Sequence, residues 1–326
     1  MLSKKTITLL LKIGFFVFAI FLLYQQITNQ TVAYQFDFSY LVTQVKDHWA
    51  LIFFVLLMMF INWTLEAMKW SLLINKIEKV SLRFSLKAIF TGITLSAFTP
   101  NKIGEYGGRV LYLKKGNKIQ GVLITFIGSM AQLLTTILFG SIAIIGLLYI
   151  FPSVSQSIEF IEFPYYVYLL IIILVNSLLL FLFLNTEIFT KMASRISFLD
   201  RYKKFTVIFS LYKKQELIKV LLFGFARYIV FSVQFFILLK VLGVDIASLY
   251  AILLIPIMFL VTSIFPVWTP ITDVSFKLLV SMYLFGLFSA NYIGVSCATF
   301  SIWIINFILP ALIGLVFLFN TKIYRT

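Results

Sequence analysis

The sequence predicts an all-α fold: a polytopic integral membrane helix bundle with inverted repeats and two re-entrant or broken-helix hairpins. Its 326 residues are 61% hydrophobic and only 12% charged, whereas soluble domains are about 45–50% apolar and about 25% charged. Apolar runs long enough to span a bilayer recur along the chain. Between them lie two polar, proline-containing stretches, and lipid does not tolerate exposed irregular backbone at membrane depth. We therefore expect these two stretches to be enclosed by protein.

The spanning segments follow from length, because a helix needs about 20 apolar residues to cross the hydrocarbon core. The first run has a basic start, retains Lys12 and lacks a small-residue cleavage site, so we expect a retained helix rather than a signal peptide. The six runs of sufficient length are residues 6–24, 49–70, 119–150, 164–184, 217–242 and 292–319. The three shorter or interrupted runs are residues 86–99, 247–265 and 271–288.

The basic residues predict the orientation. The formal net charge is +15, and the cations gather in alternate loops, above all in residues 185–216. Lysine and arginine collect in cytoplasmic loops, where they face anionic headgroups. We therefore expect a multi-pass protein of the cell (plasma or inner) membrane with both termini in the cytoplasm. The expected partners are membrane lipids and not nucleic acid, and the basic loop is expected to include an amphipathic surface helix that contacts anionic lipid or serves topology alone.

The two polar stretches have defined places in this topology. Residues 95–112 (LSAFTPNKIGEYGGRVLY) belong to the segment 86–113, which must enter and leave on the cytoplasmic face. By the same parity, residues 247–288 start and finish outside, either as a re-entrant hairpin or as two full crossings. Residues 96–100 and 262–266 both run from a small polar residue to a proline, which we interpret as weak internal duplication. Inverted repeats with broken helices that meet near the midplane are a recurring transporter architecture.

These constraints predict a single transmembrane domain, residues 1–326, with two inverted halves. The first repeat is residues 49–163 and the second is residues 217–326. An N-terminal helix and outer loop occupy residues 1–48. A connecting helix and the basic cytoplasmic loop occupy residues 164–216.

Each hairpin carries an acid and a base four residues apart, a spacing that places both on one face of a helix. The pairs are Glu105 with Arg109 and Asp273 with Lys277. A charge at the bilayer centre costs about 2.5–3.5 kcal/mol even on lenient insertion scales, which favours a functional role. The alternatives are interface charges that reach the headgroups and structural ion pairs that lock the hairpins.

Four further residues complete the candidate substrate-binding set. Lys102 and Gly104 belong to the first hairpin, where the lysine can hold phosphate by charge and the glycine allows close approach of a ligand or a neighbouring helix. Glu66 and Arg227 lie within the helices that open the two halves, where we expect either contacts with lipid headgroups or counter-charges, or no functional role. Single Asn and Gln residues within the spans are expected to hydrogen-bond between helices.

Signals for enzymatic chemistry are missing from the sequence. The only histidine, His48, lies at an interface, and the single Cys297 lies in an apolar run, so we expect neither a metal site nor an internal disulfide. No nucleotide-binding loop of the Walker type and no nucleophile–base set is present. We therefore expect no cofactor and no enzymatic activity.

Two motifs resemble a known family. The run Thr99-Pro-Asn-Lys-Ile-Gly-Glu105, followed by Arg109, resembles the Pro-x-x-(Ile/Leu)-Gly-Glu signature of the lysylphosphatidylglycerol synthase transmembrane-region family, a flippase-like domain. Lys69-Trp70-Ser-Leu-Leu resembles the basic-Trp and Leu-Leu pattern at the end of that family's second helix. In the second hairpin, the family's glycine-rich turn and Glu are replaced by a glycine-free turn and Asp273.

The resemblance covers roughly residues 45–320 and implies an inverted-repeat membrane domain that moves or handles lipids. In the full-length synthases this domain precedes a cytosolic aminoacyltransferase domain. No such domain follows Thr326, so aminoacyl transfer to phosphatidylglycerol is not expected.

The leading functional hypothesis is a lipid flippase. The headgroup would enter the polar space between the hairpins, held by Arg109, Lys102 and Lys277, while Glu105 and Asp273 orient those cations or read a cationic headgroup. The alternative is a non-catalytic membrane partner that presents a lipid substrate to a separate glycosyl- or acyltransferase. A membrane-embedded transferase is a third reading, although candidate general bases are few.

Overall fold

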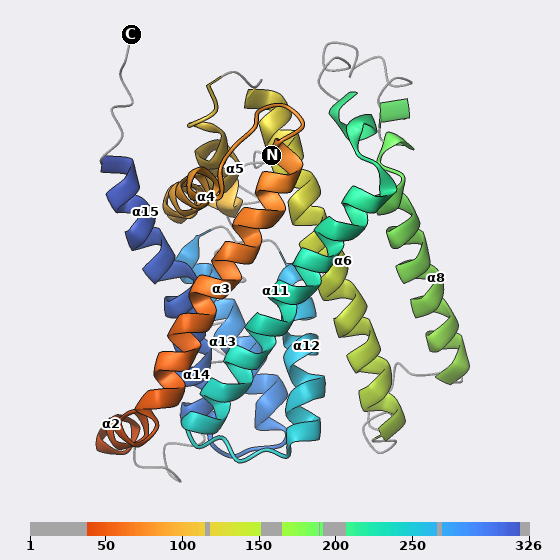
Figure 1. Cartoon of the computed structure of the whole chain (residues 1–326). Helices are drawn as coiled ribbons and strands as arrows, with labels where there is room; N and C mark the ends of the chain where they lie inside the picture. Colours follow the sequence, from red (N-terminus) through yellow and green to blue (C-terminus); the bar gives the residue numbers. More distant parts are fainter. Residues whose placement is uncertain are drawn as a thin grey trace, which may run out of the picture.

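The computed structural model describes residues 38–114, 118–150, 165–188, 190–191, 207–265 and 269–319. The first predicted span, residues 6–24, and residues 192–206 of the basic loop lie outside these ranges. The described residues form helices joined by turns, with no strand among them. The fold is therefore the predicted all-α bundle (Figure 1).

Five helices in the described part of the chain are long and apolar enough to cross a membrane, and each begins and ends close to a predicted span. The last of these helices contains a π-helical turn, in which the Leu309 N–H donates to the Ile304 carbonyl. The turn lies just before Pro310, which has no N–H to donate. The short helix α2 (Phe38–Asp47) precedes the first span. The spans are α3 (Trp49–Ile74), α6 (Lys118–Ile150), α8 (Tyr165–Leu184), α11 (Lys214–Val241), and α14 (Tyr292–Trp303) with η4 (Ile304–Ile308) and α15 (Leu309–Phe319).

The first polar stretch forms a tight helical hairpin. Its elements are α4 (Leu82–Ala97), the 3₁₀ turn η1 (Pro100–Lys102) and α5 (Ile103–Val110). The chain reverses at Asn101 and Lys102, whose φ values of 52° and 56° are left-handed. A Cβ added to Gly108 would lie 2.5 Å from the Cα of Gly92, so α5 packs on α4 almost backbone to backbone. The 16 residues of α4 rise only about 24 Å, less than the roughly 30 Å hydrocarbon core.

The second polar stretch forms a hairpin at the opposite end of the bundle (Figure 1). Its helices, α12 (Ser248–Ile264) and α13 (Pro270–Gly286), have 17 residues each, or about 25 Å. Lys102 at the tip of the first hairpin bonds to Asp273 in the first turn of α13 at 3.1 Å. The two tips therefore meet inside the bundle, which supports the re-entrant alternative for residues 247–288.

The hairpin of each half packs against the other half. Helices α3 and α11, which open the halves, pack against each other, while α4 packs on α15 and α12 packs on α6. Each hairpin thus contacts the closing helix of the other half. Both contacts pass through a glycine: a Cβ on Gly314 would lie 2.0 Å from the Phe90 carbonyl oxygen, and one on Gly140 would lie 2.5 Å from the Leu260 Cβ. This reciprocal packing is the arrangement expected of inverted repeats.

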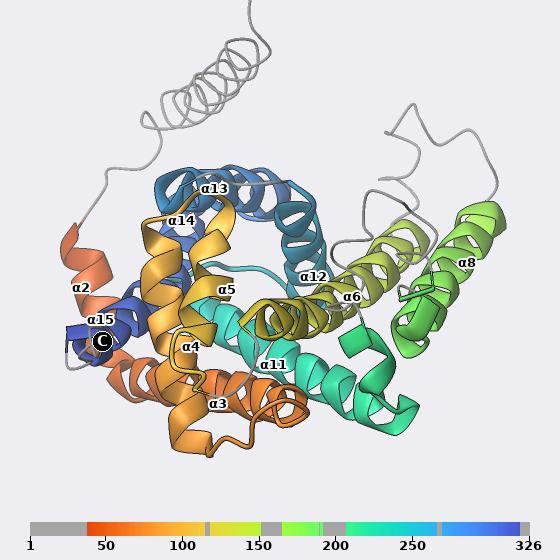
Figure 2. The same cartoon turned by 90° about the horizontal axis from the view of Figure 1, so that it is seen from above.

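Helix α8 lies at the edge of the molecule beside α6 (Figures 1 and 2). Many of its apolar side chains are exposed, among them Leu170, Leu174 and Leu178. A helix that is apolar all round and packed on one side only fits a lipid-facing position.

Candidate functional site

The centre of the site is the buried carboxylate of Glu66 on α3. One of its oxygens accepts from Arg109 of the first hairpin at 2.7 Å. The other oxygen pairs with Lys69, one turn along α3, at 2.7 Å and with Arg227 of α11. One carboxylate thus joins three cations from three separate elements. Because the carboxylate side chain is only 4% exposed, these pairs make up its electrostatic environment.

Arg109 joins the first hairpin to α3. Its Nη1 donates to Glu66 and its Nη2 to Glu105, which confirms the predicted pairing of the two residues four positions apart. The arginine side chain is 3% exposed, and both of its terminal nitrogens are engaged. In this state Arg109 ties the first hairpin to α3, and its contact with phosphate stays a prediction.

Arg227 extends the hydrogen-bond network from Glu66 to the wall of a cavity. Its Nε donates to Asn62 Oδ1 at 2.9 Å and its Nη1 to Gln132 Oε1 at 3.3 Å. Its guanidinium also lies 5.2 Å from the centroid of the Trp63 ring. These contacts hold the arginine from α3 and α6.

A row of buried amides extends the network across the bundle. Asn62 donates to Asn306 at 3.1 Å, Asn306 donates to Gln234 at 3.2 Å, and Gln234 donates to the Val55 carbonyl at 2.9 Å. The π-helical turn η4 contains Asn306. The predicted interhelical hydrogen bonds of single Asn and Gln residues are therefore confirmed.

A second charged cluster lies where the hairpin tips meet. Asp273 accepts from Lys102 at 3.1 Å and from Lys277 at 3.0 Å. The predicted pairing of Asp273 with Lys277 is confirmed, whereas the contact with Lys102 was not anticipated. The aspartate side chain is 4% exposed, but those of the two lysines are 38% and 27% exposed. The lysines are thus the accessible cations of the site.

Both hairpins turn with the same device, a Thr-Pro pair at a helix start. Thr99 accepts a bond from the Gly104 N–H, and Thr269 accepts one from the Thr272 N–H. Pro100 and Pro270 follow them at the first helical positions, where a missing N–H is tolerated. The predicted match of residues 96–100 with 262–266 stays a prediction, because position 266 lies outside the described residues.

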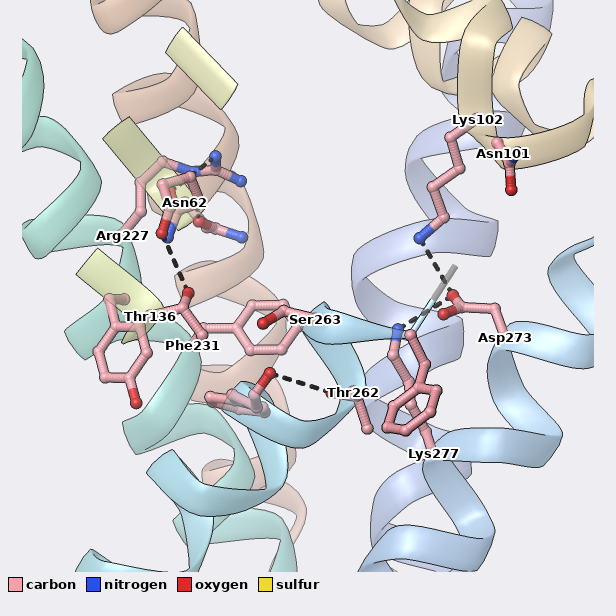
Figure 3. A pocket seen from close by; sticks show the side chains of 14 residues that line it. Asn62, Asn101, Lys102, Thr136, Arg227, Phe231, Thr262, Ser263, Asp273 and Lys277 are labelled. Atoms are coloured by element: carbon pink, nitrogen blue, oxygen red, sulfur yellow. Dashed lines mark hydrogen bonds and ion pairs between the residues drawn. The ribbon is translucent and has the colours of Figure 1, made fainter. Parts of the chain in front are cut away.

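A cavity of about 510 Å³ opens between the two charged clusters (Figure 3). Arg227 and Asn62 lie on one side of it, and Lys102, Asp273 and Lys277 lie on the other. Polar and aromatic side chains from both halves complete the wall: Asn101, Gln132, Thr136, Tyr228, Phe231, Phe259, Thr262, Ser263 and Phe265.

A smaller cavity of about 170 Å³ shares both clusters and adds Trp63, Trp303 and Glu105. Glu105 and Asp273, one from each hairpin, thus line the same space. Across the two clusters, five cations meet three carboxylates, which leaves a net charge of +2. A polar centre with surplus positive charge can attract an anionic group.

The structure brings together seven of the eight predicted site residues: Glu66, Lys102, Glu105, Arg109, Arg227, Asp273 and Lys277. Gly104 is the exception. A Cβ on it would lie 2.3 Å from the Leu95 carbonyl oxygen, so its small size serves packing within the hairpin, and it lines neither cavity.

The prediction omitted Asn62, which contacts both Arg227 and Asn306. Its spacing was a usable signal, because Asn62, Glu66 and Lys69 follow one another at four and three residues and so share one face of a helix. Gln234 and Asn306 gave no such signal, since each is a lone amide in an apolar run.

These features define a class of protein: a multi-pass membrane protein whose two facing hairpins enclose a charged cavity. The chain belongs to the lysylphosphatidylglycerol synthase TM region family, whose model matches residues 9–267. The match includes the first hairpin and α12, and it ends before Asp273. Comparisons with curated proteins and with solved structures gave no match. Membership confirms the resemblance and places the protein in a family related to lipid modification or flipping.

Proposed function

We propose that the protein translocates a lipid by admitting its headgroup to the cavity between the hairpins. The observation that carries the proposal is the meeting of the two tips, which come from opposite ends of the bundle, at a charged cavity of about 510 Å³. Small-ligand sites commonly measure about 300–1,000 Å³. The volume suits a headgroup, while the acyl chains stay in the surrounding lipid.

The contacts between the halves support a transport cycle. Inverted-repeat transporters move one repeat against the other around a site near the midplane. Here the Lys102–Asp273 pair joins the tips directly, and the buried Glu66 joins the first hairpin to α3 and α11 through Arg109 and Arg227. Breaking the contact between the tips while the pairs around Glu66 persist would open the cavity toward one end.

Lipid exchange in proteoliposomes tests the proposal. An acyl-labelled fluorescent phospholipid is equilibrated across the bilayer, and a membrane-impermeant quencher reports the exposed leaflet, with and without an imposed membrane potential. The wild type is expected to accelerate exchange over empty vesicles. Lys102→Gln is expected to lower the rate about tenfold, the effect of losing one charge-assisted hydrogen bond.

Gly107→Ala is the matched control, because a Cβ there meets nothing within 4 Å and the change lies on the same hairpin. Rates equal to those of empty vesicles under both conditions would contradict the proposal. If such a protein also co-purified stoichiometrically with a lipid-modifying enzyme, the role of presenting a lipid substrate to that enzyme would be favoured.

A further inference from the structure

The larger cavity holds more positive charge than its own carboxylate balances. Its charged wall residues are Lys102, Arg227, Asp273 and Lys277. Both lysines donate to the same oxygen of Asp273, Oδ2, at 3.1 and 3.0 Å. Arg227 is paired with Glu66, which lies behind the wall. A single carboxylate oxygen thus serves two ammonium groups that remain partly exposed.

Buried donors beside the cavities also lack acceptors. The indole N–H groups of Trp63 and Trp303 have no hydrogen-bond partner among the described residues, and both side chains line the smaller cavity. Buried polar groups in native proteins are normally paired. Unpaired donors next to surplus cations fit a ligand rich in acceptor oxygens.

We propose that this site binds a phosphate ester of net negative charge, and that its phosphate replaces the Asp273 carboxylate between Lys102 and Lys277. The inference rests on the proposed function for the entry of a headgroup into the cavity. Carboxylate and phosphate oxygens form the same charge-assisted bonds with ammonium groups, so Asp273 holds the place that a bound phosphate takes. A headgroup that adds a quaternary ammonium is disfavoured, because the described charged residues on the wall of the larger cavity are three cations and one carboxylate.

The replacement also releases one hairpin from the other. The Lys102–Asp273 pair joins the tips, and it involves a residue with left-handed backbone, φ 56°, preceded by Asn101 with φ 52°. Residues other than glycine keep that conformation only where their surroundings impose it. When phosphate takes the place of Asp273, the tip of the first hairpin is freed from α13. Ligand binding is thereby coupled to the opening of the contact.

Lipid binding to the purified full chain in detergent, measured by native mass spectrometry, tests this without requiring translocation. Phosphatidylglycerol is compared with chain-matched phosphatidylcholine, which has the same phosphodiester but adds a quaternary ammonium. The wild type is expected to bind phosphatidylglycerol about tenfold more tightly. Lys102→Gln and Lys277→Gln are each expected to weaken its binding about tenfold. Asp273→Asn, which removes the competing carboxylate, is expected to strengthen it.

The control is Lys219→Gln, which removes the same charge from an exposed position on α11 and is expected to change nothing. Inorganic phosphate is added as a competitor: displacement of the lipid supports a phosphate site open to soluble anions, and resistance assigns the site to lipid. Equal binding of the two lipids, or unchanged binding in both lysine variants, overturns the inference. If Asp273→Asn does not fold, the lysine variants decide.

The binding experiment tests the phosphate site and the exchange experiment tests the proposed function, so the two proposals can be refuted independently. Selective binding without lipid exchange would refute the proposed function and leave the phosphate site standing. Exchange that does not distinguish the two lipids, together with equal binding, would refute the phosphate site alone.

Discussion

Glu66 is the residue on which the charges of this molecule converge. Three cations approach its carboxylate, and the carboxylate and the Lys69 and Arg109 side chains are almost wholly buried. Removing one partner from a buried ion pair leaves uncompensated charge in a medium of low dielectric, which is more harmful than replacing the whole pair. The shared carboxylate is therefore the least replaceable charge in the network.

Glu66→Gln should destabilise the protein by about 3–5 kcal/mol, the usual cost of breaking a buried pair from one side. Thermal unfolding in detergent would measure the change. The matched comparison is Glu105→Gln, because Glu105 is 27% exposed and its loss leaves Arg109 still paired with Glu66. Glu66→Gln should be clearly the less stable of the two, and equal stability would show that the network does not centre on Glu66.

At the level of the elements, the first hairpin depends on glycines that allow α4 and α5 to touch. The Cβ that an alanine at position 108 would add is 2.5 Å from the Cα of Gly92, a backbone atom that cannot turn aside. The adjacent Gly107 faces open space. Position 108 therefore requires glycine, whereas position 107 has room for a larger side chain.

Gly108→Ala should lower stability by about 1–3 kcal/mol, the range seen when extra atoms are forced into a packed interior. Gly107→Ala should be neutral or slightly stabilising, because alanine favours helix over glycine. Thermal unfolding and protease sensitivity of the two variants would measure the difference. Equal melting temperatures would contradict the backbone contact between α4 and α5.

At the level of the whole molecule, the exchange of hairpins between halves places each tip against the opposite repeat. The pairs α4 with α15 and α12 with α6 make neither half a separate body. Movement of one hairpin must therefore shift a helix of the other half. This reciprocity is the structural basis for expecting a single coupled transition.

Cysteine accessibility tests the topology that this arrangement requires. In a Cys297→Ser background, Arg83→Cys and Lys213→Cys should react from the cytoplasmic side, because the positive-inside rule places basic loops there. Ser248→Cys and Ala290→Cys, at the outer ends of the second hairpin, should react only from the other side. All four native residues are exposed. Labelling of all four from one side would exclude inverted hairpins.

Much of the fold could be predicted because the membrane imposes length and polarity rules on each segment separately. The described spans match runs of apolar residues, and the i,i+4 spacing located both hairpin ion pairs, Glu105 with Arg109 and Asp273 with Lys277. The sequence alone did not show which of the two prolines in the second stretch begins a helix, and the structure shows that α13 begins at Pro270.

By itself, the sequence determined that this is a helical membrane bundle with two charged hairpins, since hydropathy and helical spacing are local properties. Only the tertiary structure decided which charges meet. Glu66 pairs with Arg227 across 161 positions and Lys102 pairs with Asp273 across 171. Such partners depend on how the helices cross. From the sequence alone, any cation within the spans and hairpins could pair with any acid there, and only the packing of the helices determines which pairs form.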